Sequence, residues 1–314
     1  MTHPNHGTLE SNRQSSIEKN LRLRAKVIQV VRTFFIEKGF LEVDTPIRIP
    51  SPAPEQYIEA VFSGNWALQT SPELCMKRLL SSGYPRIFQI CKCFRGRERG
   101  GKHLPEFTML EWYCTEIEYH EFMDQCESLI RSVAAANGNT ATLDYQGQVV
   151  DLSGPWPRIG VAEAFQRWGS LSMSAALSQD RFDEVMVNDI EPNLGFSKPV
   201  FLYDYPAERA SLAKLNPVNP ALAQRFELYI CGIELCNAFM ELTDPVEQRK
   251  RFEIEQQELL RRGKPVFPMP DYFLSALKGM PEAAGNALGL DRLLMLLADT
   301  TTIDDVVAFT PEEL

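Results

Sequence analysis

The alternation of apolar and polar residues predicts a chain that mixes helices and strands. Apolar residues recur at helical spacing over residues 17–35, so we predict a helix there that Ser15 or Ser16 caps and Gly39 ends. Residues 40–46 alternate between apolar and polar side chains and end in a proline, which is typical of a strand. Further helices are predicted at residues 72–80, 119–136, 161–190, 245–262 and from residue 291, and further strands at residues 201–205, 226–230, 233–235 and 287–290.

No internal repeat and no clean linker divides the chain, so we predict one domain over residues 16–314. Residues 1–15 are polar and are predicted to form a disordered tail. Residues 137–195 begin with a turn and hold short strand candidates, a proline-rich break and helical segments. We interpret them as an insertion into the domain.

Composition narrows the class of protein. Apolar residues make up 44% and charged residues 24% of the chain, as in ordinary soluble globular proteins. No apolar run is long enough to span a bilayer and no signal segment precedes Ile17, so we expect a cytoplasmic protein without a membrane partner. The net charge of −10 argues against a broad electrostatic surface for nucleic acid.

The seven cysteines are scattered along the chain, and no second cysteine pair or histidine cluster completes a set of zinc ligands. We therefore predict buried free thiols, with a zinc site as the alternative.

The stretch from Phe94 to Tyr113 predicts an antiparallel hairpin with a long glycine-rich tip. The tip carries three arginines, a lysine and His103, and the aromatic residues Phe107 and Trp112 follow closely. Arginines bind phosphate oxygens and an aromatic ring stacks on a base, so such a loop suits a nucleoside triphosphate. A solvated charged turn explains the loop alone equally well.

Two later stretches also place charge against glycine or apolar strands. Glu234 and Glu241 flank Asn237 in an apolar segment, and two carboxylates held near one another bind magnesium on triphosphate oxygens. Gly289 precedes Arg292 at a predicted helix start, where the glycine admits a ligand close to the backbone and the arginine reaches a phosphate. The structural alternatives are a polar strand face for the first stretch and a tight turn with a surface arginine for the second.

Together these stretches resemble the class II aminoacyl-tRNA synthetases, and within them the lysyl branch. Residues 40–46 are similar to the first class motif, residues 95–113 to the second and residues 285–297 to the third, and residues 231–244 are similar to the substrate and magnesium segment of the lysyl enzymes. The resemblance extends from residue 17 to residue 310 in the family's order. It implies an α+β catalytic fold with an antiparallel six-stranded sheet flanked by helices, and a homodimer formed through the first motif.

The resemblance also implies roles for individual residues, with ATP and Mg²⁺ as cofactors and lysine or a lysine-like amino acid as substrate. The implied catalytic residues are Arg95 and Arg292. The implied ATP-binding residues are Arg95, Arg97, Glu98, His103, Phe107, Glu234, Leu235, Gly289 and Arg292. The implied substrate-binding residues are Ser71, Glu73, Glu111, Tyr113, Asn237, Glu241 and Ala287, and the implied magnesium ligands are Glu234 and Glu241. Taken alone, Glu73 is also explained as an acid that compensates the dipole at a helix start.

Three features depart from the lysyl-tRNA synthetases. Only about 16 residues precede the first predicted helix, so we expect no anticodon-reading contact with tRNA. Ala287 stands where those enzymes have glycine, and one methyl group in an amino-acid pocket changes the favoured substrate by ~1–3 kcal/mol. In the second motif Arg97 stands where the family has glutamate, Glu98 is displaced by one position, and Leu104 replaces an asparagine.

The first two features are similar to the truncated lysyl-tRNA synthetase paralogues that attach (R)-β-lysine to a lysine side chain of translation elongation factor P. We therefore expect an AMP-forming ligase that activates a lysine-like amino acid, (R)-β-lysine in the first instance, and transfers it to elongation factor P. Two other hypotheses stay open. The chain could be a free-standing amino-acid activator that loads another carrier, or a catalytically silent synthetase-like regulator.

Overall fold

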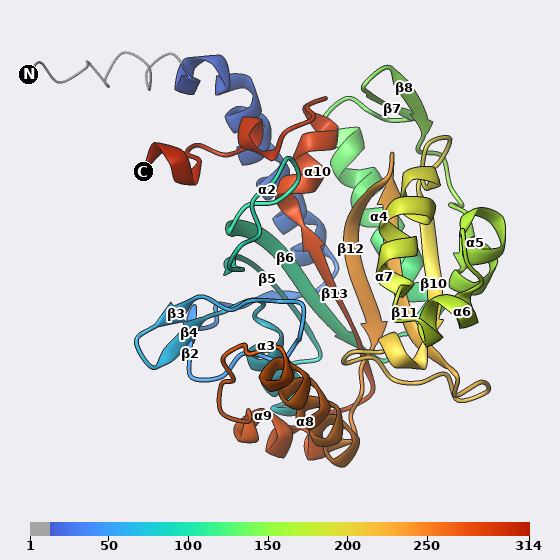
Figure 1. The fold of residues 1–314 in the computed structure, drawn as a ribbon. Coiled ribbons are helices and arrows are strands. Elements are labelled where there is room, and N and C mark those ends of the chain that lie inside the picture. Colours follow the sequence, from blue (N-terminus) through green and yellow to red (C-terminus); the bar gives the residue numbers. More distant parts are fainter. Residues whose placement is uncertain (1–12) are drawn as a thin grey trace, which may run out of the picture.

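The computed structural model of the chain describes residues 13–314 (Figure 1). The predicted disordered tail falls mostly on residues 1–12, which lie outside the described residues. Residues 13–16 are helical, so the tail does not extend to residue 15 as predicted. The first long helix, α2 (Glu18–Glu37), begins at Glu18 with Ile17 as its N-cap, and neither predicted serine caps it. Its predicted end is confirmed, because Gly39 follows the C-cap with a φ of 76°.

An eight-stranded sheet forms the centre of the fold (Figure 1). Its strands in spatial order are β1 (Leu41–Glu42), β5 (Arg86–Phe94), β6 (Glu106–Thr115), β13 (Ala283–Gly289), β12 (Ile233–Met240), β11 (Leu222–Ile230), β10 (Val200–Pro206) and β9 (Arg158–Gly160). The six inner strands are antiparallel throughout, as expected. The six-stranded prediction is wrong at the edges, where β1 and β9 each add a short parallel strand. The strand predicted over residues 40–46 is present only as the two residues of β1, and the three-residue β9 is too short to produce a readable alternation.

Three helices cover one face of this sheet: α2, α4 (Tyr119–Ala136) and α10 (Leu290–Leu297) (Figure 1). The predicted helix over residues 119–136 is confirmed as α4. On the sheet, Leu110, Trp112 and Cys114 alternate along β6 and point into the core beneath these helices. The ring of Phe35 on α2 lies 5.3 Å from that of Trp112, so aromatic packing holds the helix layer to the sheet.

Helices α3 (Glu73–Ser81), α8 (Pro245–Arg261) and α9 (Asp271–Ala276) form a second group with its own apolar cluster. The predicted start of α8 is confirmed, because the Asp244 carboxylate accepts hydrogen bonds from the backbone N–H groups of Val246 and Glu247. Two small sheets lie outside the central one. The first consists of β2 (Arg48–Ile49), β4 (Trp66–Leu68) and β3 (Phe62–Ser63), and the second of β7 (Thr142–Tyr145) and β8 (Gln148–Asp151).

The segment 137–195 is joined to the central sheet rather than standing apart from it. It contains β7 to β9 and the helices α5 (Val161–Trp168), α6 (Met173–Ser178) and α7 (Phe182–Val185), followed by short π and 3₁₀ turns. These helices pack with β10 and Tyr229 in an apolar cluster of their own, and β9 pairs with β10. Its status as a family-variable insertion stays a prediction.

All seven cysteines are free, and five of them are buried, which confirms the prediction of buried thiols in the main. Within residues 13–314 no group of three or more histidine, cysteine, aspartate or glutamate side chains is placed to hold a metal ion. Among the same residues, no helix combines the length and the apolar composition needed to cross a bilayer.

Candidate active site

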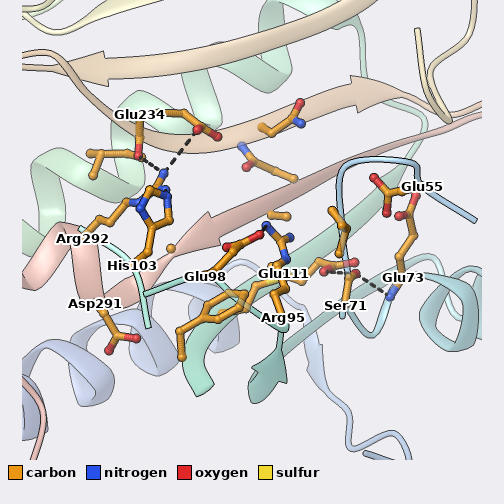
Figure 2. A pocket seen from close by; sticks show the side chains of 18 of the residues that line it. Glu55, Ser71, Glu73, Arg95, Glu98, His103, Glu111, Glu234, Asp291 and Arg292 are labelled. Atoms are coloured by element: carbon orange, nitrogen blue, oxygen red, sulfur yellow. Dashed lines mark hydrogen bonds and ion pairs between the residues drawn. The ribbon is translucent and has the colours of Figure 1, made fainter. Parts of the chain in front are cut away.

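A cavity of about 200 Å³ opens on the sheet face opposite α2, α4 and α10 (Figure 2). Its floor comes from the strands β6, β12 and β13, including Glu111, Tyr113, Asn237 and Ala287. Glu111 and Tyr113 alternate on β6 with the residues that face the helix core, so one strand supplies both core and cavity. The loop of residues 95–105 and the start of α3 contribute its walls.

The predicted hairpin is confirmed as β5 and β6, which pair from Arg86↔Cys114 to Phe94↔Glu106. Its loop is fixed by backbone hydrogen bonds to distant segments. The N–H of Gly96 donates to the carbonyl oxygen of Glu59 at 2.6 Å, and the N–H of Ile303 donates to the carbonyl oxygen of Gly101 at 2.8 Å. The loop is therefore an ordered wall of the cavity and not a solvated turn.

Basic side chains gather at one end of the cavity (Figure 2). The Nη1 of Arg292 donates to the carbonyl oxygen of Glu234 at 2.9 Å and to its carboxylate at 3.2 Å. The Nη2 of Arg292 lies 2.5 Å from the Nε2 of His103. Because a guanidinium only donates, this Nε2 accepts and His103 is neutral. Burial and the charge of Arg292 lower the pKa of both His103 and Lys102, so these groups would be stabilised by an anionic ligand.

Arg95 lies between the two ends of the cavity, beside Phe107 and Glu98 (Figure 2). Its guanidinium carbon is 5.1 Å from the centre of the Phe107 ring, a cation–π distance. The nearest approach to the Glu98 carboxylate is 4.0 Å, which makes a weak ion pair. Its Nε is buried and has no hydrogen-bond partner in the part of the chain that the structure describes. Arg95 thus keeps donors for a ligand.

Carboxylates gather at the opposite end, where Glu111 is the deepest on the floor (Figure 2). The Tyr113 hydroxyl donates to one of its oxygens at 2.5 Å and the Ser71 hydroxyl to the other at 2.8 Å. Burial, reinforced by the charge of Glu73, nevertheless raises the pKa of Glu111 to about 8. Burial and the same Glu73 carboxylate raise the pKa of Glu55 to about 7.

Lys77 lies fully buried beside this acidic end. Its ammonium donates to the Glu73 carboxylate at 2.5 Å and forms an ion pair with the carboxylate of Glu241. Burial lowers the pKa of Lys77, but the two carboxylates outweigh burial and leave it above the ordinary value. Burial raises the pKa of Glu241 to about 8 against the influence of Lys77. One cation serves several carboxylates here, so this end favours a ligand that carries ammonium groups.

Gly285 allows this close arrangement. A methyl group added at this position would lie 2.2 Å from an oxygen of Glu241 and 2.3 Å from a ring carbon of Tyr113. Glycine is therefore required for the two side chains to approach across β13.

Three cavity residues lie opposite one another on adjacent strands. Ala287 on β13 is in register with Glu111 on β6 and with Asn237 on β12. The amide oxygen of Asn237 accepts a hydrogen bond from the Nε of Arg225 at 3.0 Å, and Arg225 also donates to the buried carboxylate of Glu227 at 2.7 Å. This contact orients the Asn237 amide so that its NH₂ group is left to face a ligand.

The structure brings most of the predicted site residues to this one cavity. Its lining includes Ser71, Glu73, Arg95, Glu98, His103, Phe107, Glu111, Tyr113, Glu234, Leu235, Asn237, Ala287, Gly289 and Arg292. Their roles toward ATP and substrate stay predictions.

Two predicted residues lie elsewhere. Arg97 points away from the cavity with 86% of its side chain exposed, and it pairs with Glu59. Its left-handed φ of 61° turns the loop at that point. Glu241 is buried against Lys77, whereas Glu234 contacts Arg292 at the other end. Each of the two predicted magnesium ligands thus pairs with a basic side chain here, and their joint role toward magnesium stays a prediction.

Several residues in or beside the cavity were not predicted. Lys77 had a local signal, because it lies one helical turn after Glu73 on α3. Asp291 adjoins Arg292, and its carboxylate accepts from the N–H of Thr108 at 2.7 Å, which fixes the start of α10 against β6. Glu55 follows a proline-rich loop, where no periodicity indicates which side chain faces inward. The approach of these residues to one another depends on the tertiary fold.

The fold and the cavity define a class of protein: the chain belongs to the class II aminoacyl-tRNA synthetase family. The model of that family described as tRNA synthetases class II (D, K and N) matches residues 2–313. The resemblance noted in the three motifs is thereby confirmed.

Within this class the chain is similar to proteins named elongation factor P–(R)-β-lysine ligase. The protein of that name from Vibrio atlanticus is 39% identical over 308 residues, which cover 93% of this chain and 95% of that protein. The one from Pectobacterium atrosepticum is 39% identical over 313 residues, with the same coverage of 93% and 95%. The one from Haemophilus influenzae is 37% identical over 311 residues, with coverage of 93% and 94%.

Proposed function

We propose that this protein activates a lysine-like amino acid, (R)-β-lysine in the first instance, with ATP and transfers it to a lysine side chain of elongation factor P. The observation that carries this function is the separation of charge in one cavity, with Arg292, His103 and Lys102 at one end, Arg95 between the ends, and an excess of carboxylates at the other end. The aminoacyl adenylate of a diamino acid has the same polarity, with phosphate at one end and ammonium groups at the other. The names of the similar proteins support the same substrate and acceptor.

In this function the basic end binds ATP. Arg95 holds the α-phosphate, Arg292 and His103 lie against the distal phosphates, and the Phe107 ring stacks on adenine. Guanidinium groups suit this task because they present several donors in a fixed plane to phosphate oxygens. The weak pairing of Arg95 leaves its donors free for this contact.

The acidic end binds the amino groups of the substrate. Glu73 binds one of them, Glu111 with Tyr113 binds the other, and the Asn237 amide reaches the carboxylate. The pKa of Glu111, raised to about 8, indicates that a positive charge placed beside it would be stabilised. Lys77 and Glu241 lie buried beside this end, where Lys77 forms ion pairs with both Glu73 and Glu241.

Glu234 suits a magnesium ion bound together with the phosphates of ATP. Magnesium in such sites is held by one or two carboxylates and completed by phosphate oxygens and water, and Glu234 is the acidic residue of the cavity lining that forms an ion pair with Arg292. When bound, the ion neutralises phosphate charge that the arginines leave uncompensated.

The first reaction brings two anions together, because the substrate carboxylate attacks the α-phosphorus of ATP. Arg95 stabilises both anions and holds them in line, which lowers the barrier by charge neutralisation and alignment. Pyrophosphate leaves toward Arg292 and His103. The acceptor amine then attacks the carbonyl carbon of the adenylate, forms an amide and releases AMP.

We test this function by incubating the protein with ATP, labelled (R)-β-lysine and purified elongation factor P. The expected result is ATP–pyrophosphate exchange with the amino acid and label attached to one lysine of the acceptor. Exchange without transfer to elongation factor P, but with transfer to another carrier, would favour a free-standing activator. No exchange with any lysine isomer would favour a silent regulator and overturn the function.

We also propose that two copies associate along the outer edge of β1. This strand has a sheet neighbour only on the β5 side, and Leu41 on it is exposed, as are Ile36 and Ile47 nearby in the chain. Exposed apolar side chains beside an open strand edge are the usual features of a surface that a partner covers.

A further inference from the structure

A second, smaller cavity of about 40 Å³ adjoins the active cavity, and we call it the side cavity. It is lined mostly by apolar groups from the loops 52–60 and 264–267 and from α8. Glu55 and Ile58 line both cavities, so they form the boundary between them. A single water requires about 10–15 Å³ of such space, so the side cavity admits a narrow chain of a few heavy atoms.

The Glu55 side chain lies at this boundary. Within residues 13–314 it takes part in no hydrogen bond or ion pair. Figure 2 shows it next to Glu73, at the acidic end of the active cavity. A carboxylate beside another carboxylate is unfavourable unless a cation or a proton reaches it.

The proposed chemistry involves three amines, and the acidic end accounts for two of them. Glu73 and Glu111 are assigned to the two amino groups of the diamino acid. The third amine is the acceptor lysine, which is an ammonium ion at neutral pH because the ordinary pKa of lysine is about 10.4. An ammonium nitrogen has no lone pair, so it must lose a proton before it can attack the adenylate.

We propose that Glu55 is the proton acceptor for the transfer reaction, and that the acceptor lysine reaches the adenylate through the side cavity. Glu55 takes one proton from the acceptor ammonium and becomes a neutral carboxylic acid. The freed nitrogen attacks the carbonyl carbon, a C–N bond forms, and the bond from that carbon to the phosphate oxygen breaks. The second proton on nitrogen leaves with the phosphate of AMP. This role rests on the proposed function.

The surroundings of Glu55 suit it to this task. Burial and the charge of Glu73 raise its pKa to about 7, with a further contribution from Glu255 on α8, while Arg95 and Arg225 act in the opposite direction. A general base is most effective when its pKa lies near the working pH. Lys264, which lines the side cavity, donates to the carbonyl oxygen of Gln56 at 2.9 Å and ties the loop that carries Glu55 to the segment after α8.

The decisive experiment separates the two half-reactions in wild type and in Glu55→Gln. Adenylate formation is measured by ATP–pyrophosphate exchange, and transfer is measured in a single turnover after mixing preformed enzyme-bound adenylate with elongation factor P. For Glu55→Gln we expect exchange within about twofold of wild type and transfer at least about 100-fold slower at neutral pH, the usual size of a general-base contribution. Hydroxylamine, which is already neutral at that pH, should cleave the adenylate equally fast in both proteins.

The pH dependence gives a second readout that a structural role would not reproduce. The wild-type transfer rate should rise about tenfold per pH unit below about 7 and level off above it, because Glu55 must be ionised to accept the proton. In Glu55→Gln the rate should keep rising with pH beyond that point. Glu253→Gln, which removes one exposed carboxylate from α8, is the matched control and should behave as wild type.

The side cavity is tested separately with Val266→Trp, which narrows it and leaves Glu55 in place. Transfer to elongation factor P should fall at least about tenfold while cleavage by hydroxylamine is unchanged. Equal transfer rates in wild type and Glu55→Gln would overturn the proton-acceptor role, as would a raised KM for β-lysine in exchange, which would make Glu55 a ligand of the substrate. Exchange in wild type without transfer to elongation factor P would instead contradict the proposed function itself.

Discussion

The ammonium group of Lys77 and the carboxylate of Glu241 contact one another with neither side chain exposed to solvent. The contact joins α3 to the segment that follows β12, which are far apart in the chain. A buried ion pair of this kind adds little net stability over an apolar pair, but loss of one partner leaves an uncompensated buried charge.

Lys77→Met should therefore destabilise the protein. We expect the free energy of unfolding to fall by about 3–5 kcal/mol near pH 8, measured by urea denaturation. The loss should be smaller near pH 6, where Glu241 can take up a proton instead. The double variant Lys77→Met/Glu241→Gln should recover much of the loss. A double variant no more stable than the single one would show that the pair does not act as described.

The acidic end predicts a pH dependence of stability in the ligand-free protein. The pKa values of Glu55, Glu111 and Glu241 in the folded state, about 7 to about 8, exceed the unfolded value of about 4.3. The folded state therefore binds more protons than the unfolded state, and this proton binding stabilises the folded protein at low pH. The contribution to the free energy of unfolding is fully present below the unfolded pKa and is lost as pH rises through about 8. The melting temperature should fall between about pH 5 and about pH 8, and added β-lysine should raise it more at the higher pH. A flat profile would contradict the assigned pKa directions.

Arg95 and Arg97 are two positions apart in one loop but should differ in importance. Arg95→Ala should lower ATP–pyrophosphate exchange at least about 100-fold, because it removes donors aimed at the reacting phosphate. Arg97→Ala should change exchange by less than about threefold, since Arg97 is exposed and its ion pair with Glu59 is a surface pair. Equal losses in the two variants would mean that the loop rearranges when ATP binds.

Ala287 is predicted to select between lysine isomers. Its methyl group lies between Glu111 and Asn237 on the cavity floor, so its removal enlarges the space between the amino and carboxylate contacts. Ala287→Gly should shift the ratio of exchange rates toward α-lysine by about tenfold or more. The control Ala276→Gly, on α9 outside the cavity, should leave the ratio unchanged. An unchanged ratio in Ala287→Gly would remove the methyl group as the selector.

The edge of β1 predicts the oligomeric state. Wild-type protein should be a dimer by light scattering coupled to gel filtration, and Leu41→Lys should shift it toward monomer, because a buried lysine at the interface would lack a partner. A monomeric wild type at all concentrations would refute association through this edge.

Local sequence patterns were sufficient to predict the elements that show a hydrophobic periodicity, a turn sequence or a capping residue of their own. The helix α4, the hairpin of β5 and β6, and the start of α8 at Asp244 follow from spacing, a glycine-rich tip and a capping side chain. The short edge strand β9 could not be predicted in the same way, and of the strand predicted over residues 40–46 only Leu41–Glu42 forms β1. These edge strands exist because a neighbouring strand offers hydrogen-bonding groups, which is a property of the assembled sheet.

The residues of the candidate site also differ in whether a local sequence pattern could predict them. The motifs predicted Arg95, His103 and Arg292, because each is embedded in a stretch with a distinctive order of residues. The partner of Glu241 and the position of Glu55 depended on contacts between segments distant in sequence. The family motif assigned Glu234 and Glu241 to one magnesium ion, whereas in the folded protein Glu234 pairs with Arg292 in the cavity and Glu241 pairs with the buried Lys77 beside it.

The pairing of β11 with β12 contains one irregularity, in which Leu228 and Tyr229 face Cys236 and Glu234, so that Leu235 is an extra residue. Without it, Glu234 would point to the opposite face of the sheet from Asn237, because strand side chains alternate. The three-residue spacing of Glu234 and Asn237 therefore places both side chains on one face only together with the bulge at Leu235. Deletion of Leu235 would remove the extra residue and leave Glu234 and Asn237 on one face of a regular strand, whereas one added residue between them would turn the Glu234 carboxylate away from the cavity. Insertions at this point would therefore separate active from inactive members of the family even where every charged residue is retained.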